Sequence, residues 1–440
     1  MVWDLTSEGE DAGNQTDSGE KERKLPGNGA SKRKTVHVIV AAGEWGRDGL
    51  RYRRHRLAEY LQKQPETKDV VWLCPSPHIT EDAYSSLPNG IRQVTITDIM
   101  PHKIFRFGRY MDVFYQSKLR SLLFYLKQGE RDNRIQLWYT FPGFPLLVDL
   151  FPWDQVIYDC SDLWSSPMSG RNSALSSLRQ RIISGAENRI IQKADVIFCT
   201  SEFLREKVVE KRGNTDQVYV FENGVEFSLF AQEEEKASDV LPKDFTGSVL
   251  GFIGGIKPKL DFSLIAEVAK QRPDWLFLFV GPDGTGKHSQ FQELLALKNV
   301  LWTGSVPANE VPKYMNLIDI GMMPYKKSPY NAAVFPLKLF EFLAAGKPVV
   351  GVHLPSTKNC VEVDSYTHLE TSHPSDFLNA CERFVESKDS KEQTMRRQEL
   401  AKRKDWNVIF KEMVETCHAV SKTVRKESKT VLPIAKRKIK

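Results

Sequence analysis

Two oppositely charged residues near the start of one predicted helix have the types and the spacing to hold a nucleotide. Lys338 and Glu341 lie three positions apart in NAAVFPLKLFEFLAAGKPVVG, residues 331–351, so they share one helical face. A cation and the free amides of a first helical turn bind phosphate oxygens, whereas a carboxylate accepts hydrogen bonds from sugar hydroxyls. The same spacing is typical of an exposed ion pair worth only about 0.2 to 0.5 kcal/mol. This helix alone favours neither interpretation.

A glycine turn offers contacts to the same ligand. Gly254 and Gly255 end a predicted strand in GFIGGIKPKLDF, and Lys259 lies at the mouth of the following helix. Glycines at a strand end let phosphate oxygens approach the backbone, although a plain tight turn with a solvated lysine has the same sequence. Because Lys338 would supply a second cation, the pattern favours a diphosphate site.

Two carboxylates follow a predicted strand in the first half of the chain. Asp159 and Asp162, in VIYDCSDLWSSP, lie at the strand edge where ligands bind in open parallel sheets. A carboxylate there can orient or deprotonate a hydroxyl, and the alternative is a cap or a turn. We predict that one of the two acts on an acceptor.

The turn after the first predicted strand supplies candidate acceptor contacts. It has the sequence AAGEWGRDGLRYRRHRLAEYL, with Gly43 and Gly46 between strand and helix. Such turns are approach sites for phosphates or sugars in doubly wound folds, but this one has no G-x-G-x-x-G pattern. Gly43, Glu44 and Arg51 are our candidates.

Alternating strands and helices must position these residues. The first series of predicted strands is 35–41, 70–74, 91–97, 135–139, 155–158, 196–199 and 218–221, and the second is 249–253, 275–280, 300–302, 318–322 and 349–352. Helices in the second series are expected to begin near Asp261, Ser289, Asn309 and Leu337. This alternation is typical of parallel sheets with crossover helices and predicts an α/β protein with two Rossmann-like halves.

Length and composition restrict the class of protein. A chain of 440 residues allows two domains with tails, and its net charge of +6 fits an anionic ligand or an anionic membrane better than sequence-specific binding to nucleic acid. The six scattered cysteines predict neither a zinc site nor a disulfide framework. No apolar run is long enough to span a bilayer, so we expect a cytosolic protein, soluble or peripheral on the membrane.

Two further segments have competing interpretations. GPDGTGKHS, from Gly281 to Ser289, meets G-x-x-x-x-G-K, but His288 stands where a Walker motif needs Ser or Thr. A turn at the ligand edge of a sheet is therefore favoured over an NTPase site. Between His102 and Arg134, basic and aromatic residues interleave. This pattern favours contact with an anionic membrane or a lipid-linked acceptor over an ordinary amphipathic helix.

Several motifs in order resemble glycosyltransferase family 4, which has the GT-B fold. They are VYVFENGVEFSLF, GFIGGIKPKLDF, WLFLFVGP, NVLWTGSVP, DIGMMPY and PLKLFEFLAAGKPVV, within a resemblance covering about residues 35–420. The opening HVIVAAGEWGRDGLRYRRHRLAEYL resembles the teichuronic acid biosynthesis glycosyltransferases of Gram-positive bacteria. The resemblance implies two Rossmann-like domains facing each other across a cleft, with the acceptor on the first and the donor on the second.

The resemblance also implies roles for single residues. Glu341 matches the second glutamate of the family's paired-glutamate motif, which binds the donor ribose, and Lys338 resembles a lysine that contacts donor phosphate. Lys259 falls near the family's basic residue after the first glycine turn. The first glutamate falls on Ala333 and the histidine of an HDLWP-like segment on Ser161, so those two roles cannot be carried over.

The resemblance implies a retaining glycosyltransferase that needs no metal and no other cofactor. It would move a hexosyl or uronosyl group from a nucleotide-sugar, UDP-linked, to a lipid-linked or polysaccharide acceptor in bacterial cell-wall synthesis, at the inner face of the cell membrane. The expected divisions are a disordered tail 1–34, an acceptor domain 35–225, a linker 226–245, a donor domain 246–405, a helix 406–422 crossing back to the first domain, and a basic tail 423–440. The alternatives are a P-loop-like NTPase using Gly281 to Lys287 and a non-catalytic sugar-nucleotide-binding assembly protein.

Overall fold

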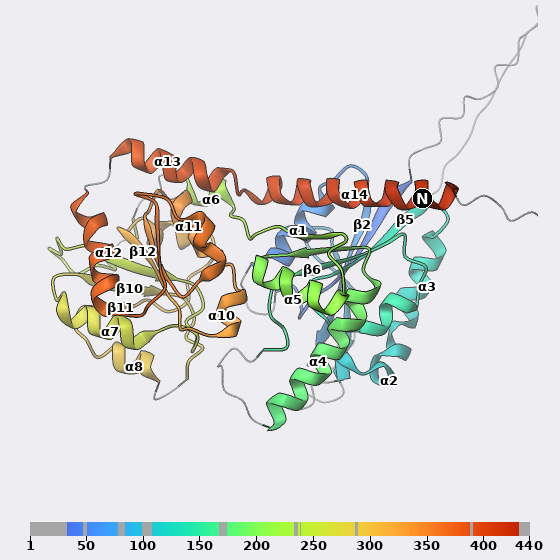
Figure 1. Ribbon diagram of the computed structural model, residues 1–440, viewed down its shortest axis with the longest axis horizontal. Helices are drawn as coiled ribbons and strands as arrows, with labels where there is room; N and C mark the ends of the chain where they lie inside the picture. Colours follow the sequence, from blue (N-terminus) through green and yellow to red (C-terminus); the bar gives the residue numbers. More distant parts are fainter. Residues whose placement is uncertain are drawn as a thin grey trace, which may run out of the picture. The chain divides into compact units, whose positions relative to one another are not determined.

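Two largely parallel sheets organise the chain, which confirms the predicted α/β class (Figure 1). The computed structural model describes residues 33–46, 51–77, 84–98, 108–166, 174–232, 236–237, 239–286, 289–387 and 390–430. Almost all of the tail predicted to be disordered, 1–34, lies outside the described residues, as does most of the basic tail. Contacts group the chain from Lys34 onward into one compact unit.

The first sheet has eight strands in the order β3-β4-β2-β1-β5-β6-β7-β8. They are β1 (Lys34–Val40), β2 (Thr67–Ser76), β3 (Tyr84–Ser86), β4 (Arg92–Thr97), β5 (Asn133–Tyr139), β6 (Gln155–Cys160), β7 (Val196–Cys199) and β8 (Val218–Val220). Each strand pairs in parallel with its neighbours except β3, which runs antiparallel to β4. The parallel strands therefore end at one shared edge, where the loops after β1 and β6 carry the predicted acceptor residues.

Both faces of this sheet are covered, which explains why its central strands β1, β5, β6 and β7 are buried over most of their length. Alternate residues along β1 pack into two separate clusters: Val38 and Val40 lie in one, and Ile39 lies in the other with Ala41, which directly follows the strand. The elements of this half are α1 (Arg53–Gln62), α2 (Asp112–Tyr115), the 3-10 helix η2 (Gln116–Leu119), α3 (Arg120–Gly129), the 3-10 helix η3 (Pro145–Asp149), α4 (Ala174–Lys193) and α5 (Glu202–Arg212).

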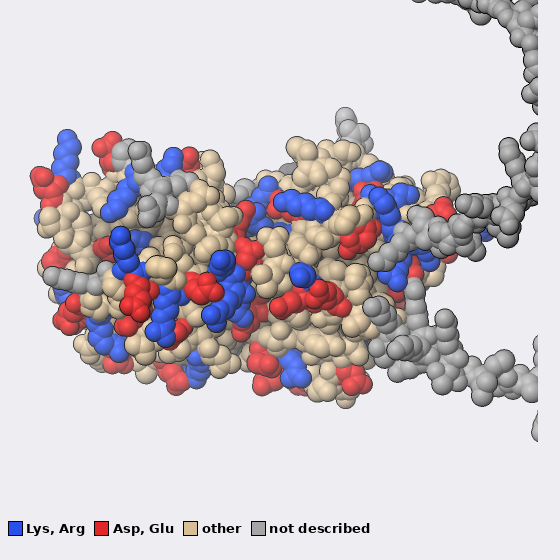
Figure 2. All heavy atoms as spheres, turned by 90° about the horizontal axis from the view of Figure 1, so that it is seen from above, with Lys and Arg blue, Asp and Glu red and all other residues tan. Residues whose placement is uncertain are grey.

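The last helix, α14 (Trp406–Thr430), packs on the first sheet although it follows the second in sequence. Its residues Phe410 and Met413 are buried in the cluster that contains Ile39, and the Gln155 side-chain amide donates to the Cys417 carbonyl at 2.9 Å. The helix continues beyond residue 422, where the basic tail was expected to begin. Figure 2 looks onto the side along which α14 runs, where acidic and basic side chains lie interspersed.

The second sheet is parallel and has the order β11-β10-β9-β12-β13-β14. Its strands are β9 (Val249–Ile253), β10 (Leu276–Val280), β11 (Val300–Trp302), β12 (Ile320–Pro324), β13 (Val349–Val352) and β14 (Tyr366–Leu369). The other elements are α6 (Phe227–Phe230), α7 (Phe262–Gln271), α8 (Gln290–Leu294), α9 (Val311–Met315), α10 (Pro329–Ala333), α11 (Lys338–Ala344), the 3-10 helix η4 (Pro355–Cys360), α12 (Pro374–Glu386) and α13 (Lys391–Lys402). The predicted helix starts are confirmed: Asp261 and Ser289 are side-chain caps of α7 and α8.

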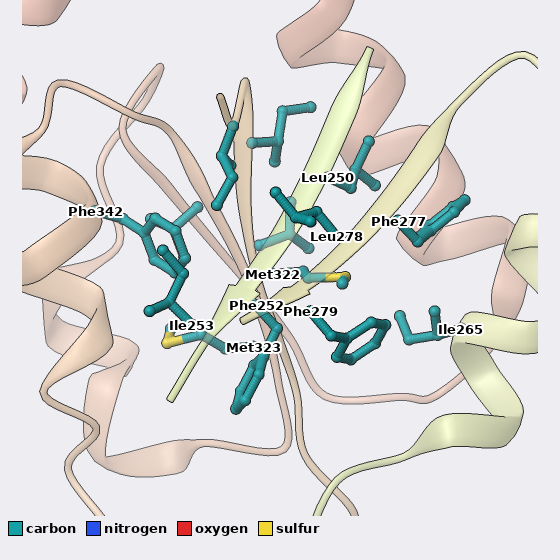
Figure 3. Packing of buried hydrophobic residues seen from close by; sticks show 14 of the residues in the cluster. Leu250, Phe252, Ile253, Ile265, Phe277, Leu278, Phe279, Met322, Met323 and Phe342 are labelled. Carbon is teal, nitrogen blue, oxygen red and sulfur yellow. The ribbon is translucent and has the colours of Figure 1, made fainter. Parts of the chain in front are cut away.

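Aromatic and aliphatic side chains from β9, β10 and β12 fill the core of this half. Figure 3 shows Phe252, Phe279 and Met322 meeting between the strands, with Phe342 of α11 on one side. Gly321 needs to be a glycine, because a Cβ there would stand 2.5 Å from the Phe342 ring. Close packing therefore fixes α11, which carries two of the predicted donor-binding residues, Lys338 and Glu341, against the sheet.

Candidate active site

The helix that carries Lys338 and Glu341 forms as predicted. α11 begins at Lys338 and ends at Ala344. Gly346, just past this end, has a φ of +75°, the left-handed conformation that glycine adopts most readily. Glu341 lies in its first turn and is half-buried. Burial raises the pKa of Glu341, while the charges of Lys338 and Arg56 lower it. Both cations are thus near enough to favour the charged form of this carboxylate.

The ammonium of Lys338 reaches the glycine turn after β9. A Cβ on Gly254, whose φ is +123°, would stand 2.6 Å from the Lys338 Nζ, so the lysine fills the space that glycine leaves open. The Nζ also lies 5.0 Å from the Phe252 ring centroid. Burial lowers the pKa of Lys338, with Glu341 opposing this effect. The structure therefore brings Lys338 to the glycine turn, and its contact with donor phosphate stays a prediction.

Lys259 is held beside the same turn. Its carbonyl accepts hydrogen bonds from the Lys326 backbone N–H at 3.0 Å and from the Asn331 side-chain amide at 3.1 Å. Its ammonium lies over two aromatic rings, 5.1 Å from Tyr325 and 5.6 Å from Tyr330. Burial, and after it the charge of Lys338, lower the pKa of Lys259 to about 7, while the charge of Asp162 opposes them. The two ammonium groups are therefore close enough for each to disfavour the charge of the other, and a bound anion would oppose this repulsion.

Asp162 faces these lysines from the first half of the chain. Its Oδ1 accepts a hydrogen bond from the Tyr330 hydroxyl at 3.3 Å, which joins the loop after β6 to α10. Burial raises the pKa of Asp162, opposed first by the charge of Lys259 and then by that of Arg54. A half-buried carboxylate near the cations can accept a hydrogen bond from a bound hydroxyl.

Asp159, the other candidate, lies inside the first sheet. Its carboxylate is 1% exposed, and both oxygens accept from the Nε of Arg53 at 3.0 and 2.9 Å. Arg53 is also buried, and it donates to the Glu222 carbonyl and the Met413 sulfur. This pair ties α1 to the sheet and to α14, which leaves Asp162 as the carboxylate that faces the lysines.

The acceptor candidates after β1 have structural partners. The Gly43 carbonyl accepts a hydrogen bond from Trp72 Nε1 at 3.0 Å. Arg51 lies 5.1 Å from the Trp45 ring centroid and 3.4 Å from Glu59. Glu44 is half-buried, and residues 47–50 of this turn lie outside the described residues. Acceptor binding by Gly43, Glu44 and Arg51 stays a prediction.

Three strand ends of the first sheet hold the segment from Tyr330 to Phe335. Besides the contact with Asp162, the Ser201 hydroxyl donates to the Ala333 carbonyl at 2.9 Å, and the Asn223 side-chain amide donates to the Phe335 carbonyl at 2.7 Å. These bonds bring the loops after β6, β7 and β8 to the chain that leads into α11. The site is therefore assembled from both halves of the protein.

Sequence reasoning missed Tyr330, Asn331 and Lys257. A Cβ on Gly255 would stand 3.3 Å from the Lys257 Cε, which places this third lysine at the glycine turn. Its signal was its place two residues before Lys259 in GGIKPKL. Tyr330 had no comparable signal, because its role depends on a contact with a residue 168 positions away.

The Walker-like loop has a structural explanation in its described part. Gly281, with a φ of +133°, lies so close to Gly254 that a Cβ would overlap the Gly254 carbonyl. The Asp283 side chain accepts from the backbone and the hydroxyl of Thr285, at 2.7 and 2.6 Å, and closes the loop on itself. Lys287 and His288 lie outside the described residues. Gly281 thus lets the ends of β10 and β9 approach each other, and the described part of the loop is a turn that leaves a strand.

Within the described part of the chain, no three His, Cys, Asp or Glu side chains are grouped so that they could bind a metal ion. No helix among the residues described has the length and apolar character that crossing a membrane requires.

Comparisons with known proteins agree with this geometry. Residues 247–387 match the family model described as glycosyl transferases group 1. Over 387 residues the chain is 52% identical to TuaH of Bacillus subtilis (strain 168), which is named as a teichuronic acid biosynthesis glycosyltransferase. The match covers 88% of this chain and 98% of the relative.

Solved structures of low sequence identity share the fold. Sucrose-phosphate synthase from Thermosynechococcus elongatus has a TM-score of 0.68 at 15% identity, covering 89% of this chain and 100% of that one. Anabaena HepE in complex with UDP-glucose has a TM-score of 0.59 at 16% identity, covering 88% and 99%. The chain belongs to the group 1 glycosyltransferases and has their GT-B fold.

Proposed function

We propose that the enzyme transfers a sugar from a UDP-sugar to an acceptor held at the carboxyl edge of its first sheet. The observation that carries this proposal is the convergence of Lys338 and Lys259 beside the glycine turn at Gly254. Two buried cations beside the backbone of a glycine turn can bind a diphosphate. Glu341, which lies on α11 with Lys338, can accept hydrogen bonds from ribose hydroxyls. HepE, which has the same fold, was solved with UDP-glucose.

The lysines would act mainly on the leaving group. When the bond between the anomeric carbon and the phosphate oxygen breaks, the diphosphate gains negative charge. Lys338 and Lys259 stabilise that charge more strongly in the transition state than in the bound substrate, and this difference accelerates transfer. No metal ion has a place in this proposal, because the cations of the site are side chains.

Asp162 would receive the acceptor. The bond from the acceptor oxygen to the anomeric carbon forms as the phosphate leaves, and the acceptor proton passes to the carboxylate, which later returns it to water. Asp162 interacts with Lys259, one of the proposed phosphate ligands. Attack from the side of the departing phosphate retains the anomeric configuration, so this proximity supports a retaining reaction.

The acceptor in this proposal is a lipid-linked or polysaccharide chain of the bacterial cell wall, teichuronic acid-like in character. The name of the Bacillus subtilis relative, at 52% identity, supports this class. The transferred group would be a hexosyl or uronosyl residue.

We further propose that the enzyme works on the inner surface of the cell membrane and contacts it through the region of α2 and α3. Large apolar side chains are exposed here: Met111, Val113 at 76%, Phe114 and Phe124 at 67%. Exposed cations lie in the same region: Lys118 is on η2, and Arg120 and Lys127 are on α3. Apolar side chains that enter the interface and cations that meet anionic headgroups are the usual elements of peripheral binding.

A donor panel tests the central proposal. Purified protein is mixed with UDP-glucose, UDP-glucuronate, UDP-N-acetylglucosamine, UDP-N-acetylgalactosamine and ADP-glucose, and both the melting temperature and the slow release of free nucleotide are followed. Stabilisation by one UDP-sugar that is lost in Glu341→Ala, together with turnover that is lost in Lys338→Ala, supports the proposal. Binding without turnover would favour the non-catalytic alternative, and stabilisation only by ATP with magnesium would favour the NTPase.

A further inference from the structure

Tyr330 lies between the proposed acceptor residue, Asp162, and the proposed donor residue Lys259. Its hydroxyl donates to Asp162, and its ring lies against the ammonium of Lys259. One side chain therefore contacts both the carboxylate that would receive the acceptor and a cation that would hold the donor. Burial and the charge of Asp162 raise the pKa of Tyr330, so the hydroxyl keeps its proton and acts as a donor.

The backbone around Tyr330 is fixed from several sides. The Asn331 side chain, which is fully buried, donates to the carbonyls of Lys259 and Lys326 at 3.1 and 2.7 Å. The Ser328 hydroxyl caps α10 by accepting from the Asn331 N–H at 3.1 Å. Ser201 holds the end of the same helix through the Ala333 carbonyl. The Tyr330 hydroxyl is thus presented to Asp162 from an anchored helix.

Among the side chains of α10, the tyrosine is the one placed to donate a hydrogen bond to Asp162. Ala333 ends the helix without a polar side chain, and the Asn331 amide group is committed to the Lys259 loop. Tyr330 is the α10 side chain that contacts Asp162. A carboxylate that receives one hydrogen bond at Oδ1 keeps its other oxygen directed toward a second donor, such as an acceptor hydroxyl.

We propose that Tyr330 is a positioning residue for the transfer step: its hydroxyl fixes the orientation of Asp162, while its ring supports Lys259. This inference rests on the proposed function, because it assigns Tyr330 an effect through Asp162. Removing only the hydroxyl should therefore slow transfer without weakening donor binding. Removing the ring as well should slow transfer and also weaken donor binding.

The test compares Tyr330→Phe with Tyr330→Ala, with Tyr314→Phe of α9 as a matched control. The probe is the UDP-sugar with the largest thermal shift in the donor panel, and release of UDP with water as acceptor is measured from pH 5 to pH 9. For Tyr330→Phe we expect an unchanged melting temperature and KM, with kcat at least about tenfold lower, because a hydrogen bond to a charged group is lost. For Tyr330→Ala the KM should rise as well, whereas Tyr314→Phe should match the wild type.

The pH profile separates a positioning role from a structural one. The groups around Asp162 that favour its charged form are Lys259, Arg54, Tyr330 and Lys257. Tyr330→Phe removes one of them and leaves the three cations, so the acidic limb of kcat should move to higher pH. The inference would be overturned if Tyr330→Phe had the wild-type kcat and the wild-type acidic limb. It would also be overturned if the variant lost activity only in proportion to a lower melting temperature.

Asp162→Asn, assayed in parallel, distinguishes this inference from the proposed function. If Asp162→Asn keeps its turnover, the proposed acceptor step fails and the role of Tyr330 fails with it. If Asp162→Asn is inactive while Tyr330→Phe behaves as wild type, only the inference about Tyr330 is wrong. No release of UDP by the wild type would contradict both.

Discussion

The Lys338 ammonium lies against Gly254, 2.6 Å from the position that a Cβ on this glycine would take. The glycine therefore does more than permit a turn: its missing side chain is the space in which the lysine sits. Since the two residues lie at the end of β9 and the start of α11, the contact depends on packing between these elements. A larger residue at Gly254 would push the Lys338 ammonium away, so substitution of this glycine tests whether donor binding depends on the position of Lys338.

Gly254→Ala should displace the Lys338 ammonium and weaken binding of the UDP-sugar by about tenfold or more, since charge-assisted hydrogen bonds contribute about 1.5 to 3 kcal/mol. The measurement is calorimetric titration with UDP. Gly286→Ala is the matched control: its φ of +91° imposes comparable backbone strain, but nothing lies within 4 Å of the added Cβ. Equal affinities for the two variants would show that strain, and not Lys338, determines binding.

Binding of the UDP-sugar should take up a proton near neutral pH. In the free enzyme burial holds the pKa of Lys259 at about 7, and a bound diphosphate favours the charged ammonium and raises it. Affinity should thus be constant below pH 7 and fall about tenfold per pH unit above it, until the pKa of the complex is reached. Titrations in buffers of different ionisation enthalpy measure the uptake directly.

Lys259→Arg provides the comparison for this pH dependence, because a guanidinium stays charged throughout the range. In this variant the fall in affinity above pH 7 should disappear. A wild-type affinity that is flat from pH 6 to pH 9 would place Lys259 away from the diphosphate.

Much of the fold could be predicted from the sequence because buried parallel strands are continuous apolar runs. β9, β10 and β13 are each buried along their whole length, and each was expected within a residue or two. β3 and β14 were missed. β3 is the short, fully exposed run YSS, and β14 has two polar residues at the centre of YTHL and lies at the edge of its sheet, so neither presents an apolar run.

The site was predicted where its residues follow strand ends and missed where distant segments meet. The glycine turn and Lys338 were expected to converge because ligands bind at the carboxyl edge of parallel sheets. Asp159 and Asp162 could not be distinguished, since the partner of Asp159 is Arg53, 106 positions away. Tyr330 was missed for the same reason: only the packing of α10 against the loop after β6 gives it a role.

Asp159→Asn should destabilise the protein, whereas Asp162→Asn should not. Asp159 and Arg53 form a pair whose side chains are only 1% and 4% exposed, and breaking a buried pair leaves an uncompensated charge at a cost of about 3 to 5 kcal/mol. The measurement is urea unfolding followed by circular dichroism. The assignment fails if Asp159→Asn unfolds at the wild-type urea concentration but loses turnover.

The proposed membrane surface predicts a specific loss of vesicle binding. Replacing Val113 and Phe124 with serine removes two of the most exposed apolar side chains of α2 and α3. Burying such a side chain contributes about 1.5 to 3 kcal/mol, so the double variant should sediment with phosphatidylglycerol vesicles far less than the wild type does. Val408→Ser, at an exposed position of α14, should sediment normally. Release of the wild type by 0.5 M salt but not by the apolar substitutions would mean that charge alone holds the enzyme to the vesicle, and would reject insertion of Val113 and Phe124.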